Sequence, residues 1–427
     1  MLRISLVGVL ALSAMTSVSA QKIDKIINAK EVGRIETILA SDAMEGRRTF
    51  TPGIDKAADF IAAEFRKAGI QPVKDGSYFQ SFTVPQTEFV ITGTIDDKPL
   101  VPEKVALLTI QNELKLTSSS EFEKVVIKPG DTLQVTMRRL QGTGKNYLFI
   151  VDPAHTEVFG YIRSARRMNP NMKSNFLMVS GTEDVTSFDV SITKKAYDAP
   201  LKNVVGIIPG KSKKDEIVIF SGHYDHLGIT KPNETGDSIF NGANDDAAGT
   251  TAVIMLANYF AKKKDNERTI VFAAFTAEEV GGFGARHFSN QFDSSKVMAM
   301  FNIEMIGTDS KWGKNSAYIT GYEKTDLGKI LEKNLAGTKF KFYPDPYPDQ
   351  QLFYRSDNAT LARQGVAAHT ISTSKMDSEP NYHKVTDEVG TLDMKNMAEI
   401  IKAIAISSTS IIAGKDTPGR VDTKALR

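Results

Sequence analysis

Cysteine is absent from the 427 residues of the chain. Its absence excludes structural disulfides, thiolate metal sites, a cysteine nucleophile and the lipobox cysteine of a bacterial lipoprotein. Any metal site must therefore use histidine nitrogen and carboxylate oxygen. Histidine is scarce too, with six residues, so the position of each one is informative.

A surplus of either charge is also missing. The chain has 53 Lys and Arg against 51 Asp and Glu, a formal net charge of +2 and a pI near 8.3. This balance gives no electrostatic case for binding nucleic acid or an anionic membrane. Hydrophobic residues make up 41% of the chain, which is ordinary for a globular protein with a sizeable core.

Long apolar runs are missing as well, so no transmembrane segment is predicted. The N-terminal run Leu6–Met15 is too short to span a bilayer. Arg3 precedes it and the small residues Ser17–Ala20 follow it, so residues 1–20 are predicted to be a secretory signal peptide that is cleaved before Gln21. A periplasmic or secreted location follows from this prediction. The alternative is a buried N-terminal strand or helix.

The texture of the remaining sequence predicts three parts. Residues 21–87 are expected to begin the main domain, residues 88–198 to form an inserted β-rich domain, and residues 199–427 to complete the main domain. Within the insertion, the stretches Phe89–Ile95, Thr132–Met137 and Phe188–Ile192 are predicted as strands. A set of long elaborated loops is the alternative reading of the insertion.

Strand and helix patterns alternate after residue 199. Six short apolar stretches between polar turns are predicted as buried strands: Val204–Ile208, Ile217–Phe220, Thr269–Phe275, Val297–Ile303, Ala317–Thr320 and Val366–Ile371. Helical spacing occurs in Thr250–Lys263, Gly284–Gln291, Leu327–Leu335 and Met394–Ile412. This alternation predicts an α/β fold, a three-layer sandwich with a mostly parallel central sheet. Such sheets bind ligands beyond the carboxyl ends of their strands.

Most of the informative ionisable residues follow those predicted strands, and we expect them to converge. They are His223, Asp225, Asp245, Asp246, Glu278, Glu279, Glu304 and His383. Imidazole and carboxylate ligands suit zinc, a carboxylate can bridge two ions, and a further carboxylate can move the proton. Each residue taken alone has a simpler explanation. The two adjacent aspartates, for example, could only cap the helix that follows them.

Five motifs, in their order along the chain, make the sequence similar to the co-catalytic di-zinc aminopeptidase family, which includes bacterial leucine aminopeptidases and glutamate carboxypeptidases. The motifs are Ser221–Gly228, Gly242–Gly249, Ala277–Glu279, Asn302–Gly307 and Tyr382–His383. The resemblance covers most of residues 196–427 and extends more weakly to Asp42–Arg48 and Gly69–Gln80.

The resemblance implies two zinc ions and a peptide substrate, with residues 199–427 as the peptidase catalytic domain. One zinc would be bound by His223 and Glu304, the other by Glu279 and His383, and Asp245 would bridge them. The family also implies a cis peptide bond between Asp245 and Asp246.

The same resemblance implies roles for the residues around the metals. Glu278 would be the general base, Asp225 would orient His223 with its carboxylate, and Tyr382 would donate a hydrogen bond to the developing oxyanion. Arg355 would belong to the substrate pocket.

The sequence departs from the family at one ligand, because the aminopeptidases usually carry aspartate where this chain has Glu304. This change puts the metal spacing and the substrate class in doubt. His226 and His287 match no ligand position and are expected to be structural or surface residues.

An aminopeptidase is the leading functional expectation. A carboxypeptidase or dipeptidase with the same site, in which Arg355 meets a terminal carboxylate, is the first alternative. A catalytically inactive binding module that keeps the fold is the second. The donor set also leaves other divalent metals open, and the sequence indicates no particular oligomeric state.

Overall fold

The computed structural model describes residues 23–73, 75–164 and 172–426. The predicted signal peptide, residues 1–20, therefore lies outside the described residues. Among the described residues, no helix combines the length and the apolar character needed to cross a lipid bilayer.

The described chain divides into two compact units. The first unit contains the residues up to Thr83 together with those from Pro200 onward, and the second contains Val84–Ala199. The chain passes between the units within two long strands, β2 (Phe79–Ile95) and β9 (Phe188–Ile208). The predicted insertion, residues 88–198, falls inside the second unit.

A mixed sheet with a parallel centre organises the first unit. Its strands are β1 (Gln71–Pro72), β10 (Lys213–His223), β13 (Arg268–Phe275), β14 (Val297–Ile303), β15 (Ser316–Ile319), β16 (Lys341–Pro344), β17 (Ala368–Ser372) and the end of β9. β10 pairs in parallel with both β13 and β14, and β14 pairs in parallel with β17. β9 runs antiparallel to β13 at one side of this parallel centre, and β15 runs antiparallel to β17 at the other.

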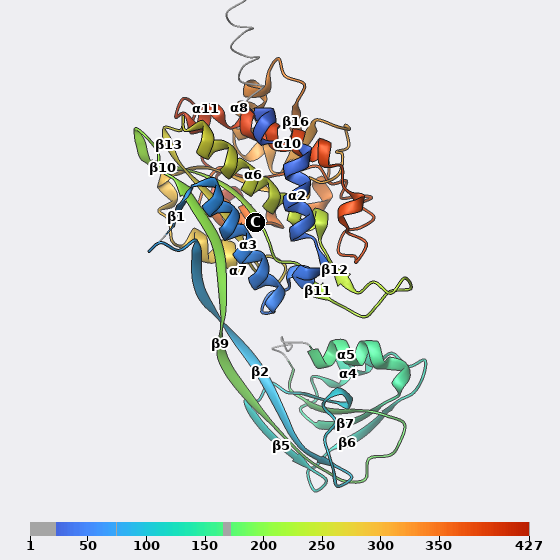
Figure 1. Ribbon diagram of the computed structural model, residues 1–427. Helices are drawn as coiled ribbons and strands as arrows, with labels where there is room; N and C mark the ends of the chain where they lie inside the picture. The colour runs from blue at the N-terminus through green and yellow to red at the C-terminus, as the bar shows by residue number, and fades with distance from the viewer. Residues whose placement is uncertain (1–22, 74, 165–171, 427) are drawn as a thin grey trace, which may run out of the picture. The chain divides into compact units, whose positions relative to one another are not determined.

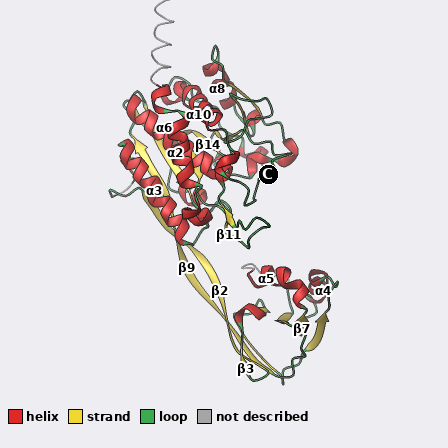
Figure 2. Cartoon of the chain, turned by 45° about the vertical axis from the view of Figure 1, so that its right-hand side comes forward, coloured by secondary structure: helices red, strands yellow, loops and turns green. Residues whose placement is uncertain are grey.

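Helices cover both faces of this sheet (Figures 1 and 2). One face carries α2 (Ala29–Leu39), α3 (Pro52–Ala68), α6 (Ala248–Lys263), α8 (Leu327–Leu335) and α10 (Met394–Ser407), and the other carries α7 (Phe283–Ser289) and α9 (Asn358–Ala362). Strand β10 is buried on both sides for this reason. Val218 and Phe220 pack into the core on the first face, whereas Ile219 packs into the core on the other face. The predicted three-layer sandwich is confirmed.

The last predicted helix, Met394–Ile412, is two helices in the structure. α10 ends at Ser407, and a short helix, α11 (Thr409–Ile412), follows. β11 (Gly228–Ile229) and β12 (Ile239–Phe240) form a separate antiparallel pair in the first unit.

The second unit has its own four-stranded sheet. Its order is β4 (Val105–Leu108), β8 (Asn175–Ser180), β7 (Asn146–Val151) and β6 (Glu123–Ile127), and the helices α4 (Leu133–Leu140) and α5 (Thr156–Ser164) accompany it. β5 (Glu113–Thr117) pairs with β9, and β3 (Lys98–Pro99) pairs with β2. The predicted strand Thr132–Met137 is wrong, because this stretch lies in and just before α4. Leu133, Met137 and Leu140 recur at helical spacing and pack into one core.

Candidate metal centre

Loops that follow the parallel strands build the candidate site. His223 is the last residue of β10 and is in register with Phe275, the last residue of β13. Glu278 and Glu279 follow β13, and Glu304 follows β14. Because neighbouring parallel strands end at the same edge of the sheet, these side chains meet there.

Asp245 is shared between two groups of ligand atoms. One carboxylate oxygen, Oδ1, lies 3.3 Å from His223 Nε2, which is also 3.9 Å from Glu304 Oε1. The other oxygen, Oδ2, lies 3.2 Å from His383 Nε2, which is 3.3 Å from Glu279 Oε2. We call these the His223 group and the His383 group. The structure thus brings together all five residues that the sequence offered as metal ligands.

The ligand loops are fixed by buried polar contacts. The carboxylate of Asp246 accepts hydrogen bonds from the backbone N–H groups of His223, Gly249 and Met305 at 3.0–3.1 Å. A side chain at Gly249 would collide with the carbonyl oxygen of Ile303 at 2.1 Å, so only glycine allows this close approach. The peptide bond between Asp245 and Asp246 is cis, as predicted.

The contact made by Asp225 differs from the predicted one. His223 Nδ1 meets the backbone carbonyl of Asp225 at 3.1 Å, whereas the Asp225 carboxylate is 3.8 Å away. That carboxylate instead accepts the backbone N–H groups of Glu278 at 3.0 Å and Glu279 at 3.2 Å. Asp225 therefore orients His223 through its main chain and the two glutamates through its side chain.

Two supporting residues could not be read from the sequence. Asp387 accepts the backbone N–H groups of Asn244 at 2.8 Å and Asp245 at 3.0 Å, which ties the loop of His383 to Asp245. Arg47 is fully buried and donates to the carbonyls of residues 39, 224, 241 and 242. The only linear signal for Asp387 is its place four residues after His383.

The electrostatics of the site fit a pair of bound cations. Within the described ranges, the ion pairs of Asp245, Glu279 and Glu304 are all with histidine. His223 Nε2 is buried and has no hydrogen-bond partner among the described residues. Several buried carboxylates with no lysine or arginine partner, together with an imidazole nitrogen aimed at them, form the donor set that a metal pair requires.

The pKa shifts follow from this concentration of acids. Hydrogen bonds to Asp245 and Glu279 raise the pKa of His383 to about 10. Burial alone would raise the pKa of Glu279, but hydrogen bonds from His226 and His383 lower it to about 2. Burial raises the pKa of Glu278 well above its ordinary value, and the nearby Asp357 raises it further. Glu278 therefore holds a proton more readily than an ordinary glutamate does.

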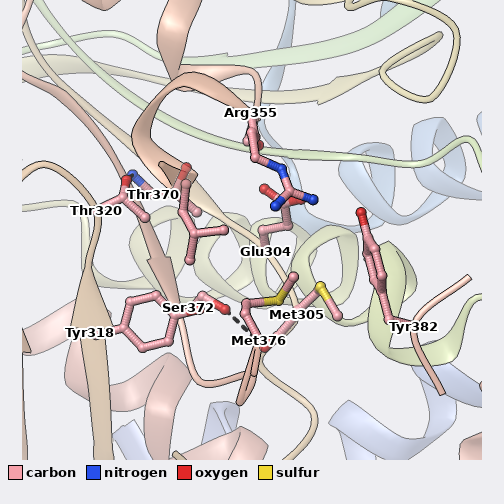
Figure 3. Close-up of a pocket in the computed structure, with 11 residues that line it drawn as sticks. Glu304, Met305, Tyr318, Thr320, Arg355, Thr370, Ser372, Met376 and Tyr382 are labelled. Carbon is pink, nitrogen blue, oxygen red and sulfur yellow. Dashed lines mark hydrogen bonds between the residues drawn. The ribbon is translucent and has the colours of Figure 1, made fainter. Parts of the chain in front are cut away.

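A pocket opens beside Glu304 (Figure 3). Apolar side chains supply part of its lining (Met305, Tyr318, Leu352 and Met376), and Thr320, Thr370 and Ser372 add hydroxyl groups. Arg355, Glu304 and Tyr382 also line it. The Tyr382 ring stacks on His383 with centroids 4.0 Å apart, and burial raises the pKa of Tyr382 to about 12.

Comparisons with known sequences place the site in a family. Residues 203–407 match the profile of Peptidase family M28. A stretch of 116 residues is 32% identical to a probable zinc metalloprotease of Leptosphaeria maculans and covers 27% of this chain and 26% of that protein. A stretch of 209 residues is 26% identical to a probable leucine aminopeptidase of Trichophyton verrucosum and covers 47% and 54%. The chain thus spans from about a quarter to about a half of these relatives.

Solved structures share the fold. A zinc aminopeptidase from Bacillus subtilis aligns with a TM-score of 0.60 at 16% identity, over 94% of this chain and 97% of that one. The aminopeptidase from Aneurinibacillus sp. strain AM-1 aligns with a TM-score of 0.54 at 16% identity, over 95% and 98%. Every predicted metal ligand lies inside residues 203–407, the stretch that is similar to peptidase family M28.

Proposed function

We propose that this chain is a di-zinc metallopeptidase that removes residues from the free N-terminus of peptides. The observation that carries the proposal is the carboxylate of Asp245, which offers one oxygen to the His223 group and the other to the His383 group. A carboxylate placed in this way suits a bridging ligand of two cations.

The metals would be held by the two groups already described. His223 and Glu304 would bind one zinc, Glu279 and His383 the other, and Asp245 both. A bound zinc pair lowers the pKa of water and polarises a carbonyl group. The remaining chemistry belongs to the protein's own side chains.

Glu278 is suited to move the proton. Its carboxylate is buried beside the ligands, and its raised pKa favours accepting a proton from the attacking water and passing it to the leaving amine. Asp225 fixes its backbone. Tyr382 stays protonated at neutral pH and can donate a hydrogen bond to the oxygen that gains charge.

The lining of the pocket fits a substrate with a free ammonium group. Its acid, Glu304, could receive the ammonium of a free N-terminus beside the metals. Met305, Leu352 and Met376 would receive an apolar N-terminal side chain. The curated relative in Trichophyton is named a probable leucine aminopeptidase, which agrees with this choice.

The Glu278→Gln variant tests the proposal. We expect kcat to fall by about 10²–10⁴-fold because the proton carrier is lost, while two zinc ions remain bound. The matched control is Glu234→Gln, a change on an exposed loop, which should leave kcat unchanged. Full activity in the Glu278 variant, or cleavage of N-acetylated peptides as fast as free ones, would contradict the proposal.

Arg355 supports a second candidate, a carboxypeptidase or dipeptidase. Its guanidinium lines the pocket, and its hydrogen bonds within the described residues go to Gln350 rather than to an acid. A cation in this position could receive a substrate carboxylate. Peptides amidated at the C-terminus separate the candidates, because a carboxypeptidase would lose them as substrates whereas an aminopeptidase would still cleave them.

We also propose export to the periplasm or the medium, on the basis of the residue pattern of positions 1–20. Intact mass of the protein recovered from a bacterial periplasmic fraction tests this. A mature chain that starts at Gln21 is expected, and a full-length chain confined to the cytoplasm would refute export.

A further inference from the structure

His226 is a buried histidine that matches no ligand position of the family and has no part in the proposed mechanism. It stands three residues after His223, and its exposed fraction is 1%. Its backbone N–H donates to the carbonyl of Arg47 at 3.1 Å. Its ring meets the ring of Phe240 edge-on at 6.4 Å and that of His383 at 5.8 Å. The imidazole is therefore held from several sides.

Gly242 leaves the space that this ring occupies. A side-chain carbon at Gly242 would lie 2.4 Å from Cδ2 and 2.6 Å from Cγ of His226. The ring thus lies flat against the loop that carries Asp245. Any larger residue at position 242 would push the ring away from its present contacts.

The ring makes one hydrogen bond to a ligand candidate. His226 Nδ1 lies 2.8 Å from Oε1 of Glu279. The other oxygen of that carboxylate, Oε2, lies 3.3 Å from His383 Nε2. Since a carboxylate only accepts, Nδ1–H must be the donor. The two oxygens of Glu279 therefore have separate partners, one a hydrogen-bond donor and the other the His383 group.

We propose that His226 is a positioning residue for the second metal. Its Nδ1–H holds Oε1 of Glu279, so that Oε2 alone is presented to the metal shared with Asp245 and His383. Metal-ligating carboxylates that are fixed by such outer hydrogen bonds bind more tightly. The stretch from His223 to His226 then contributes to both groups. His223 is a ligand of the His223 group, and His226 holds Glu279 of the His383 group. This inference rests on the proposed di-zinc function.

A direct ligand is the competing role. Ligand atoms of His226, Asp245 and Glu279 all lie within 4.8 Å of one another. The hydrogen bond to Glu279 favours the positioning role, because Nδ1 cannot donate this bond and bind a metal at the same time. A ligand role would need metal on Nδ1 or on Nε2, which has no hydrogen-bond partner among the described residues, and metal on either nitrogen can be measured in the zinc-loaded protein.

Two substitutions at position 226 separate the effect of the hydrogen-bond donor from the effect of the ring. His226→Phe keeps a ring and removes the donor, whereas the amide nitrogen of His226→Asn stands where Nδ1 stood. Zinc is titrated into the chelated protein against a chromophoric competitor. We expect His226→Phe to lower the affinity for the more weakly bound zinc by about 10–100-fold. His226→Asn should keep that affinity within about threefold of the wild-type value. The tighter site should be unchanged in both variants.

His287→Phe is the matched control, because its ring stacks on Phe82 at 4.3 Å outside the site. Equal zinc affinity in His226→Phe and wild type, or equal losses in both His226 variants, would overturn the proposal. A wild type that binds fewer than two zinc ions would instead defeat the proposed function. Nitrogen-15 NMR of the zinc-loaded wild type needs no variant to fold: a protonated Nδ1 and a metal-free Nε2 on His226 are expected, and an unprotonated Nδ1 or a metal-bound Nε2 would refute the positioning role.

Discussion

The two groups that share Asp245 sit in different surroundings. His223 ends a central strand and has a side chain only 1% exposed, whereas the His383 side chain is 36% exposed. His383 also lies in an irregular loop and has a positive φ of 56°. The His223 group is thus part of the rigid sheet edge, and the His383 group depends on a surface loop.

The difference shows how the loop compensates for its exposure. Asp387 anchors the His383 loop on the backbone of Asn244 and Asp245, and His226 supports Glu279 from behind. Exposed irregular segments open more readily than sheet edges. We therefore expect the two metals to differ in affinity and exchange rate although they share one carboxylate.

Asp245→Asn should have the largest effect, because the substituted residue belongs to both groups. The amide removes the charge and one of the two acceptor oxygens. We expect less than one zinc per chain and a loss of activity above about 10⁴-fold, beyond the loss that one acid–base group causes. Metal analysis and peptide cleavage measure both effects. Asp265→Asn, which changes an exposed ion pair with Lys263, is the control. Two bound zinc ions in Asp245→Asn would exclude a bridging role.

His383→Ala and His223→Ala each remove the histidine of one group, so that the two groups can be measured separately. Chelator competition in the wild type should release zinc in two phases, the first from the His383 group. We expect His383→Ala to lack this first phase and to keep one tight zinc, and His223→Ala to lose the tight phase. Loss of the tight phase in His383→Ala would reverse the assignment.

The fold was predictable where the apolar residues follow the pattern of a strand or of a helix, but not both. Val297–Ile303 and Leu327–Leu335 have the predicted bounds of β14 and α8, because the first is a short buried apolar run and the second has clear helical spacing. The strand prediction for Thr132–Met137 was wrong because a short segment with both β-branched and apolar residues fits the period of a strand as well as that of a helix. Its helical period shows only when Leu140 is included.

The site was predictable at the metal ligands and not at their supports. Ligand chemistry restricts the residue types, and their places after strands suggest that they meet. Arg47 and Asp387 bind backbone groups of distant residues. His226 acts on Glu279, which lies 53 positions later. Contacts of this kind arise only when loops are packed, so linear spacing does not reveal them.

His369 differs from the histidines of the site in its surroundings and in the direction of its pKa shift. It is buried with Nδ1 2.8 Å from the Thr320 carbonyl and Nε2 2.8 Å from the Thr325 hydroxyl. Burial lowers the pKa of His369 to about 4, because the opposing effects of the Thr320 carbonyl and of Glu323 are smaller, whereas hydrogen bonds to carboxylates raise the pKa of His383 to about 10.

The lowered pKa of His369 predicts acid sensitivity. The unfolded chain, with a histidine pKa near 6.5, binds this proton more readily than the folded one does. Stability from His369 is therefore complete above about pH 6.5 and is lost as the pH falls towards 4, by roughly 3 kcal/mol. Denaturant unfolding of the chelated protein at several pH values should show a shallower loss in His369→Gln than in wild type. The His155→Gln change, at a half-buried histidine of the second unit, should leave the slope unaltered, and parallel curves for His369→Gln and wild type would show that acid acts elsewhere.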